Sequence, residues 1–414
     1  MQIVKAKRIE PQVINSALYI FLGLIPIVDM INGYNLLENN SIGSLVGVVF
    51  RIVSILFLFF LIIQKNRILR LVLLNLFILF IFLVVYINYF RTKNVNGLID
   101  EAMYATKLIL PILYALGISN AVNNGIVDED IVDKILTFFS FLVPLTLIVP
   151  MILNLGYSSY DLGGGYKGFY YSNNELNILM ISITIFNFWQ LTAHKKKFFF
   201  IPFLLNSVSM LLIGSKTSIL CVLLLGMIYF FRKISIQSII KILIVLTILI
   251  FLGSRIFSEF FDEIIFRFQY YYTITNGSDN IFNFLLSNRN LRIVPTITEV
   301  FLTNKSGFLN FIFGYGHYQQ FDPNVLQSIM EMDFVDTIIW YGVVVTAAVL
   351  GFYIYVLIRG IKRKADFVYI LIYITIFSFS IVAGHVLYSA LAGGIFGIIG
   401  SRLLHSDSKI KNNH

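Results

Sequence analysis

The sequence is poor in charged residues. Only 13% of its 414 residues are Asp, Glu, Lys or Arg, whereas 58% are hydrophobic, and the mean hydropathy is +0.83. A soluble protein of this length needs a charged surface to meet water, so the composition excludes a soluble globule. The 40 Phe and 23 Tyr residues suit a bilayer and its interfaces. A membrane protein is therefore predicted.

Cysteine is nearly absent as well. Cys221 is the one cysteine, which excludes an intramolecular disulfide and a cysteine-based metal cage. The histidines do not cluster, so we expect no metal and no other cofactor. The net charge of +9 does not indicate a nucleic-acid partner, because the basic residues form short clusters between apolar runs. A cleavable signal peptide is not predicted, since the first apolar run, Val13–Ile31, lacks a small-residue cleavage site.

Long apolar runs are what the sequence has in abundance. Runs of roughly 17–25 residues, enough to cross the hydrocarbon core, recur about twelve times. We therefore predict an all-α membrane protein of about 12 transmembrane helices, forming a single polytopic domain over 1–414. The predicted spans are Val13–Tyr34, Leu45–Ile63, Leu71–Tyr89, Ala102–Val122, Ile135–Leu155, Leu176–Thr192, Phe198–Ile213, Thr217–Phe231, Ile239–Ser254, Phe334–Ile358, Phe367–Gly384 and Val386–Leu404.

The orientation follows from the basic clusters. If the N-terminal Lys5, Lys7 and Arg8 are cytoplasmic, the clusters at 65–70, 195–197, 232–233, 359–364 and 409–411 lie on the same side. An even number of spans then places both termini in the cytoplasm, in a multi-pass protein of the cytoplasmic membrane. The extracytoplasmic side receives two substantial loops, 156–174 and 255–333. The second is far longer than an ordinary connection, and its aromatics favour short amphipathic helices at the membrane surface.

Three cations lie in or at the ends of predicted spans. Arg51, Lys107 and Lys216 all fall towards the expected outer face. Charges at such depth are costly, so each suggests a function. One interpretation is an anion site for a lipid-linked phosphate or pyrophosphate. The alternative is a buried ion pair, such as Asp29 with Arg51.

The long loop carries further candidate residues. Arg289 and Arg292 lie three apart, so a helix there would form a phosphate clamp or merely a solvated face. Gly314–Gly316 predicts a tight turn that lets the backbone approach a ligand or another segment. We interpret His317, beside it, as a surface residue of the loop rather than a base.

Two acids stand where the loop enters the tenth predicted span. Glu331 and Asp333 are candidate general bases, because half-dry carboxylates can have raised pKa values. The alternative is a polar boundary in which Asp333 is the N-cap of the span.

Five short motifs follow one another along the chain. They are Gly168–Leu176, Ser215–Thr217, Ser287–Arg289, Phe313–Gly316 and Glu331–Gly342. In this order they resemble motifs of the superfamily of O-antigen ligases and O-antigen polymerases (Wzy-type), with Lys216 in place of an Arg, and the resemblance covers roughly Gly163 to Tyr355. One departure is that Glu331–Met332 stands where the ligases have His-Asn. The resemblance then implies that Glu331 or Asp333 takes that histidine's role as base, and it favours a polymerase.

The resemblance implies a GT-C-like fold and a metal-independent glycosyltransferase acting on polyprenyl-pyrophosphate-linked oligosaccharides. Glu331 and Asp333 are the implied catalytic residues. The implied pyrophosphate-binding residues are Lys216, Arg289 and Arg292, with Arg51 and Lys107 as further candidates. Sugar-binding candidates are Lys167, Tyr170, Asn173 and Asn174.

The expected function is therefore a polysaccharide repeat-unit polymerase of capsule, exopolysaccharide or O-antigen assembly. Its partners would be the lipid-linked oligosaccharide and membrane lipid, together with a chain-length regulator and a flippase. Two alternatives stay open. One is a ligase that transfers glycan to a lipid or wall acceptor, and the other is a 12-span transporter or flippase of lipid-linked sugars. Transporters bind substrate near the midplane between related halves, and neither feature is evident here.

Overall fold

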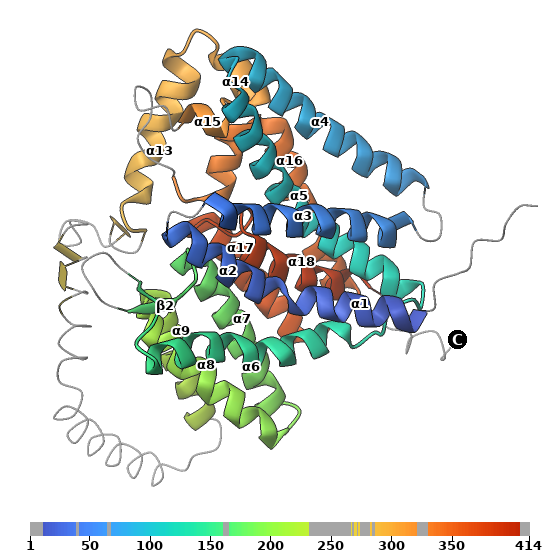
Figure 1. The fold of residues 1–414 in the computed structure, drawn as a ribbon, viewed down its shortest axis with the longest axis vertical. Coiled ribbons are helices and arrows are strands. Elements are labelled where there is room, and N and C mark those ends of the chain that lie inside the picture. Colours follow the sequence, from blue (N-terminus) through green and yellow to red (C-terminus); the bar gives the residue numbers. More distant parts are fainter. Residues whose placement is uncertain are drawn as a thin grey trace, which may run out of the picture. The chain divides into compact units, whose positions relative to one another are not determined.

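The computed structural model describes residues 11–38, 41–63, 68–159, 165–231, 266, 269–270, 272–273, 282–283, 286–320 and 330–405. Helices dominate this part of the chain (Figure 1). A helix satisfies all its backbone hydrogen bonds internally, which is why apolar segments adopt it in a membrane. The class predicted from composition, an all-α multi-span membrane protein, is confirmed.

The order of helices follows the apolar runs. They are α1 (Pro11–Gly23), α2 (Ile25–Leu37), α3 (Ser41–Ile63), α4 (Ile68–Thr92), α5 (Val95–Asn123), α6 (Ile131–Ile152), α7 (Asn173–Thr192), the 3₁₀ turn η1 (Lys197–Phe199), α8 (Phe200–Ile213), α9 (Lys216–Phe231), α13 (Arg289–Ile297), the π-turn η2 (Thr298–Thr303), α14 (Gly307–Phe313), α15 (His317–Gln320), α16 (Asp333–Lys362), α17 (Phe367–Val382) and α18 (Ala390–Leu404).

Six helical segments are long and apolar enough to cross a membrane, and four apolar helices are shorter. The first predicted span is two helices, α1 and α2, which meet at Leu24 beside Pro26. Every other predicted span overlaps a helix, except Ile239–Ser254, which lies outside the described residues. The last span, Val386–Leu404, begins four residues too early, since α18 starts at Ala390. The count of twelve spans stays a prediction. The described part of the long loop forms the short helices α13, α14 and α15.

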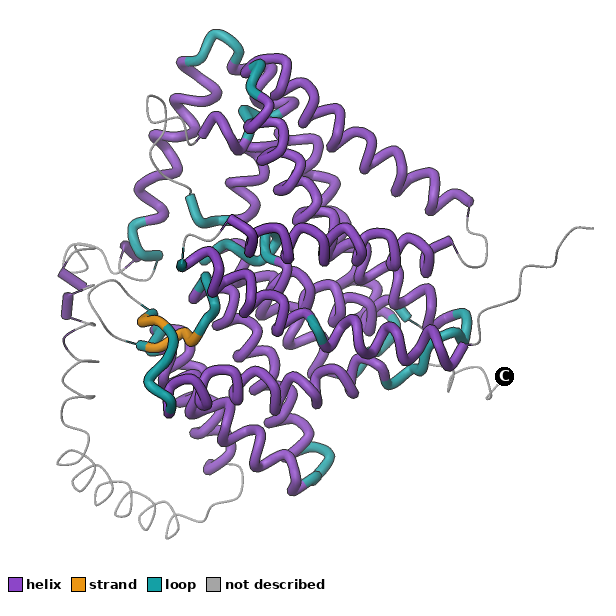
Figure 2. The backbone as a smooth tube through the Cα atoms, viewed as in Figure 1, coloured by secondary structure: helices purple, strands orange, loops and turns teal. Residues whose placement is uncertain are grey.

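The loop at 156–174 contains the only β-strands among the described residues. Strands β1 (Tyr157–Ser158) and β2 (Tyr166–Gly168) pair antiparallel, with Tyr157 opposite Gly168 (Figure 2). Tyr166 donates its hydroxyl to the carbonyl of Leu155 at 2.5 Å, which ties the ribbon to the end of α6.

The chain divides into two compact units. The terminal unit is Met1–Phe139 with Thr296–His414, and the central unit is Ser140–Pro295. Each unit is described by itself, and the single polytopic domain expected from the sequence stays a prediction.

Helix α5 is the centre of the terminal unit. Its most apolar stretch is 78% buried, against 28–39% for the other five long segments. Helix α18 packs directly on it through small residues. A Cβ on Gly397 would lie 2.4 Å from the Pro111 carbonyl oxygen and 2.6 Å from Tyr114 Cβ. Because Gly393 and Gly400 also face α5, the two backbones approach as closely as in other small-residue helix pairs of membranes.

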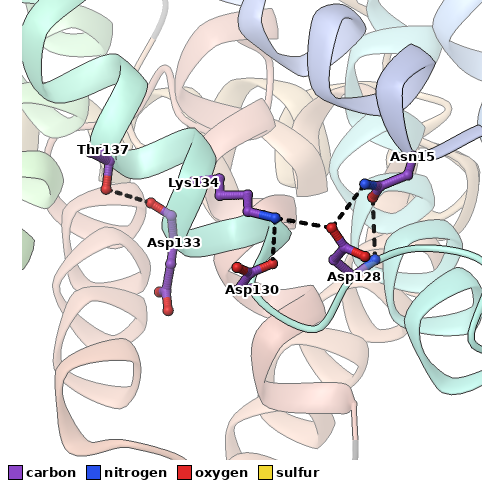
Figure 3. Close-up of polar contacts among 6 residues, drawn as sticks. All are labelled: Asn15, Asp128, Asp130, Asp133, Lys134 and Thr137. Atoms are coloured by element: carbon purple, nitrogen blue, oxygen red, sulfur yellow. Dashed lines mark hydrogen bonds and ion pairs between the residues drawn. The ribbon is translucent and has the colours of Figure 1, made fainter. Parts of the chain in front are cut away.

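After the C-terminus of α5, a polar cluster holds the loop that leads into α6 (Figure 3). Asn15 of α1 donates to Asp128 Oδ2 at 2.9 Å and accepts from the Asp128 backbone N–H at 3.2 Å. Lys134 contacts Asp128 and Asp130, each at 2.9 Å. The hydrogen bond from Lys134 lowers the pKa of Asp128. These groups are exposed, so they fix the loop's course more than they stabilise the fold.

The α5–α18 contact gives a first prediction. Gly397→Ala forces a methyl group against the Pro111 carbonyl, so overpacking should destabilise the protein by about 1–3 kcal/mol. Thermal unfolding of the purified protein in detergent measures this as a lower Tm.

Gly351→Ala is the matched control, because nothing apart from the nearby backbone of α16 itself lies within 4 Å of a Cβ at this position. Its Tm should equal the wild-type value or exceed it. Equal Tm values for Gly397→Ala and the wild type would show that the two helices do not depend on this close approach.

Candidate functional site

In the central unit, a polar network fixes the start of α9. The hydroxyl of Ser215 accepts a hydrogen bond from the Ser218 backbone N–H at 3.1 Å, which caps the helix. Asn177 of α7 is 1% exposed. Its amide donates to Ser215 Oγ and, at 3.4 Å, to Thr217 Oγ1, and its oxygen accepts from Ser218 Oγ. The Ser215–Thr217 motif is therefore held rigidly against α7.

This network places Lys216 beside a second cation. Lys216 is the first residue of α9 and lies near enough to Arg289 for the two charges to repel. Arg289 opens α13, and Arg292 follows within the same helix, so the predicted helical spacing is confirmed. Ser287 and Asn288 precede them in left-handed conformations (φ 53° and 62°). Like charges held together in this way favour a bound anion.

The predicted sugar-binding residues belong to the ribbon and the start of α7. Tyr170 is 0% exposed, and its hydroxyl lies 2.9 Å from Thr146 Oγ1, so its ring is part of the core of the central unit. Asn173 donates to the Ser159 carbonyl. Lys167 donates to the Tyr171 carbonyl at 3.1 Å. Sugar contact stays a prediction for these residues and for the half-exposed Asn174.

Two further predicted cations lie in the terminal unit, so they do not share a unit with Lys216, Arg289 and Arg292. Arg51 is 8% exposed on α3. Lys107 of α5 is half-buried, and its ammonium lies 4.3 Å from the centre of the Tyr104 ring. Such a contact stabilises a cation away from water.

The glycines of Gly314–Gly316 allow the chain to lie against other helices. A Cβ on Gly314 (φ 79°) would lie 2.1 Å from the Trp340 carbonyl oxygen. Opposite it, Gly342 (φ 78°) interrupts α16 and faces the Ile312 carbonyl in the same way. Arg91 donates to the Gly314 carbonyl at 2.9 Å. The predicted turn is confirmed, and it approaches another segment.

His317, which follows this turn, is 4% exposed, so its interpretation as a surface residue was wrong. Its Nδ1 pairs with the carboxylate of Asp100 on α5. Its ring stacks on Tyr104 with 3.5 Å between ring centres and meets Trp340 edge-on at 4.6 Å. Asp100, Tyr104 and Lys107 are spaced as one face of α5, a signal in the sequence that could have marked this site.

Asp333 and Asp336 bind backbone rather than solvent. Asp333 Oδ2 accepts from the N–H groups of Val386 and Leu387, both at 2.9 Å. Asp336 accepts from the N–H groups of Met330 and Met332 at 3.1 and 3.2 Å. The N-cap of α16 is Met332, so the N-cap role considered for Asp333 was wrong. Its carboxylate instead holds the loop between α17 and α18.

Glu331 precedes α16 in a left-handed conformation (φ 55°) and is half-buried. Gly384, also left-handed, allows the α17–α18 loop to approach it, since a Cβ there would meet the Glu331 carbonyl. Among the described residues, no three His, Cys, Asp or Glu side chains gather as metal ligands would.

The helices define a multi-pass membrane protein with cations fixed at helix ends in one unit and a buried His–Asp pair in the other. The chain belongs to the family of O-antigen ligase like membrane proteins, whose model matches residues 12–254. The matched range includes Ser215–Thr217 and Arg51, whereas Arg289 and the motifs after it lie beyond the match. No curated protein and no solved structure matches the chain at a significant level.

The Asp333 contacts give a second prediction. Asp333→Asn replaces two charge-assisted hydrogen bonds with weaker ones in a buried position, which should cost about 1–3 kcal/mol. Thermal unfolding in detergent would show the loss as a lower Tm. Asp366→Asn is the control, since this side chain is 62% exposed and its loss should cost less than about 0.5 kcal/mol. Equal Tm values for both variants would rule out Asp333 as the anchor of the loop.

Proposed function

We propose that the protein is a polysaccharide repeat-unit polymerase that joins polyprenyl-pyrophosphate-linked oligosaccharides on the outer face of the cytoplasmic membrane. Membership of the O-antigen ligase like family supports transfer of lipid-linked glycans in general. In the reaction, a sugar hydroxyl on one repeat forms a bond to the anomeric carbon of the glycan on another lipid carrier. The bond from that carbon to the pyrophosphate breaks, and the lipid pyrophosphate leaves with the electron pair.

The observation that carries this proposal is that two cations, Lys216 and Arg289, lie close together. The departing pyrophosphate gains negative charge, so transition-state stabilisation requires fixed positive charge where it departs. The start of α9 is held by the capping network of Ser215 and Asn177, and Arg289 lies near enough to Lys216 for the two charges to repel. Lys216 also stands at the N-terminus of α9, where the helix dipole favours anions. Arg292, in the same unit, is a further cation proposed for this ligand. Arg51 and Lys107 of the terminal unit stay predictions as pyrophosphate-binding residues.

The reaction also needs a group that takes the proton from the attacking hydroxyl. Glu331 and Asp333 stay predictions for this role. Of the two, the structure favours Glu331, because Asp333 Oδ2 is occupied by two backbone N–H groups.

The family's name favours a second candidate, transfer of the finished glycan to a lipid or wall acceptor. It uses the same leaving group and differs only in acceptor. The polymerase and ligase functions are distinguished by the lipid-linked glycan that accumulates in cells without the protein. Loss of a polymerase leaves a single lipid-linked repeat, whereas loss of a ligase leaves lipid-linked polymer of full length.

Removal of Arg289 tests the leaving-group site. In cells that depend on the plasmid-borne gene, Arg289→Ala should reduce long-chain polysaccharide about 100- to 1000-fold, as loss of one preorganised charge donor does. Single lipid-linked repeats should accumulate, and gel profiles with mass spectrometry of extracted lipids measure both. Lys305→Ala, which removes an exposed cation from the same loop, is the control and should keep normal chain lengths. Normal chain lengths in Arg289→Ala at equal protein level would remove Arg289 from the site.

The proposed orientation is tested by cysteine labelling of intact cells in a Cys221→Ser background. Ser306→Cys lies in the exposed turn before α14 and should react with a membrane-impermeant maleimide added from outside. Glu129→Cys lies in the exposed loop before α6 and should react only after the membrane is opened. The reverse pattern would place the long loop in the cytoplasm and overturn the outer-face assignment.

A further inference from the structure

One buried amide of the central unit contacts residues on both sides of Lys216 in the sequence. Asn177 lies near the start of α7 and is 1% exposed. Its Nδ2 donates to Ser215 Oγ and, at 3.4 Å, to Thr217 Oγ1. Its Oδ1 accepts from Ser218 Oγ, so both polar atoms of the amide are bonded. A single side chain of α7 therefore holds the residues before and after the lysine.

Capping of α9 does not by itself require this amide. Ser215 Oγ already accepts the backbone N–H of Ser218 at 3.1 Å, which is the bond that an N-cap supplies. Helices in lipid can pack through small residues without any buried polar group. A buried polar network whose members are bonded adds one property that such packing lacks, a single defined geometry. We conclude that Asn177 fixes the first turn of α9 relative to α7.

The turn before α9 is held by a second segment, the β-ribbon. Helix α8 ends at Ile213, and Gly214 follows in a left-handed conformation (φ 72°). Gly165, at the start of β2, packs so closely on this turn that a Cβ there would lie 2.3 Å from the Ile213 carbonyl oxygen. The Gly165 carbonyl in turn accepts from the Ser159 N–H at 3.1 Å. The backbone that leads to Lys216 is therefore fixed by the ribbon as well as by α7.

The lysine is the one charged residue of the turn that this network holds. Ser215 and Ser218 are 7% and 0% exposed, whereas Lys216 is half-buried. A lysine side chain has many rotamers, and ordering it on a ligand costs free energy. A fixed backbone lowers that cost, because the ammonium then starts close to its bound position. It also keeps the charge of Lys216 near that of Arg289.

We propose that Asn177 is a positioning residue that sets the place of Lys216 in the pyrophosphate site. Asn177 does not itself contact the anion and acts through the first turn of α9. This inference rests on the proposed function, which assigns Lys216 to the departing pyrophosphate. It has a specific consequence. Loss of Asn177 weakens anion binding only while Lys216 is present.

The test is a double-mutant cycle on the full-length protein in lipid nanodiscs, with inorganic pyrophosphate as the probe. Isothermal titration calorimetry at constant pH measures Kd for wild type, Asn177→Ala, Lys216→Ala and the double variant. Lys216→Ala should raise Kd at least about 10-fold, as loss of one charge-assisted hydrogen bond does. Asn177→Ala should raise Kd about 3- to 10-fold in the wild-type background and less than about 2-fold in the Lys216→Ala background. A general loss of packing would instead weaken binding equally in both backgrounds.

Ser218→Ala is a second variant, which covers the case that Asn177→Ala does not fold. It removes the hydroxyl that donates to Asn177 Oδ1 and keeps the backbone N–H that caps α9. Its Kd for pyrophosphate should rise about 2- to 5-fold, again only while Lys216 is present.

Asn206→Ala is the matched control. Asn206 of α8 is a second buried amide of the central unit, 0% exposed, and its Nδ2 donates to the carbonyls of Ser140 and Pro202 at 2.8 and 2.6 Å. It lies about two helical turns before the end of α8. Its loss should lower Tm, as loss of Asn177 does, because buried hydrogen bonds are removed in both variants. The Kd for pyrophosphate should stay at the wild-type value.

The inference is overturned if Asn177→Ala and Ser218→Ala both bind pyrophosphate as wild type does, if they weaken binding equally in both backgrounds, or if Asn206→Ala weakens it as much. Wild-type protein that does not bind pyrophosphate, or Lys216→Ala that binds it equally well, would overturn the proposed leaving-group site and this inference with it. Wild-type protein that binds pyrophosphate but does not extend lipid-linked repeats would overturn the polymerase function alone.

Discussion

The terminal unit depends on how closely α18 can approach α5. Apolar surface alone does not bring helices together in lipid, because the lipid tails are as apolar as the side chains. Close packing must supply the attraction, and the absence of a side chain at Gly393 and Gly397 allows it. Pro111 helps, since its ring fills the space above Gly393. Helix α18 therefore packs on the middle of α5, at Pro111 and Tyr114. The N-terminal part of α5 carries Asp100, Tyr104 and Lys107.

Backbone that leaves the helices inside this unit must still find hydrogen-bond partners, because lipid offers none. The loop between α17 and α18 uses the Asp333 carboxylate for two of its N–H groups. The segment before α16 uses Asp336 in the same way, and the turn at Gly314 uses Arg91. Charged side chains at the ends of spans can therefore serve to bond non-helical backbone, and their presence does not by itself indicate a catalytic role.

This explains which parts of the site could be predicted from the sequence. Helix positions follow from runs of apolar residues, and the spacing of Arg289 and Arg292 needed only a local helix, so both were accessible. The sequence marked Asp333 as an acid at the start of a span, but not its contacts, because Val386 and Leu387 lie 53 and 54 residues away. His317 was misjudged for the same reason, since its burial depends on Asp100 and Tyr104 of a helix much earlier in the chain. The spacing of Asp100, Tyr104 and Lys107 marks one face of α5, but no local pattern pairs that face with His317.

Charged side chains have different neighbours in the two units, and each unit is considered by itself. In the central unit, the start of α9 holds Lys216 near enough to Arg289 for the two charges to repel. In the terminal unit, the His317 imidazole instead pairs with the carboxylate of Asp100. Repulsion between two cations is relieved by a bound anion, whereas a His–Asp pair already satisfies its own charges. The proposed pyrophosphate site therefore belongs with the cations at the start of α9.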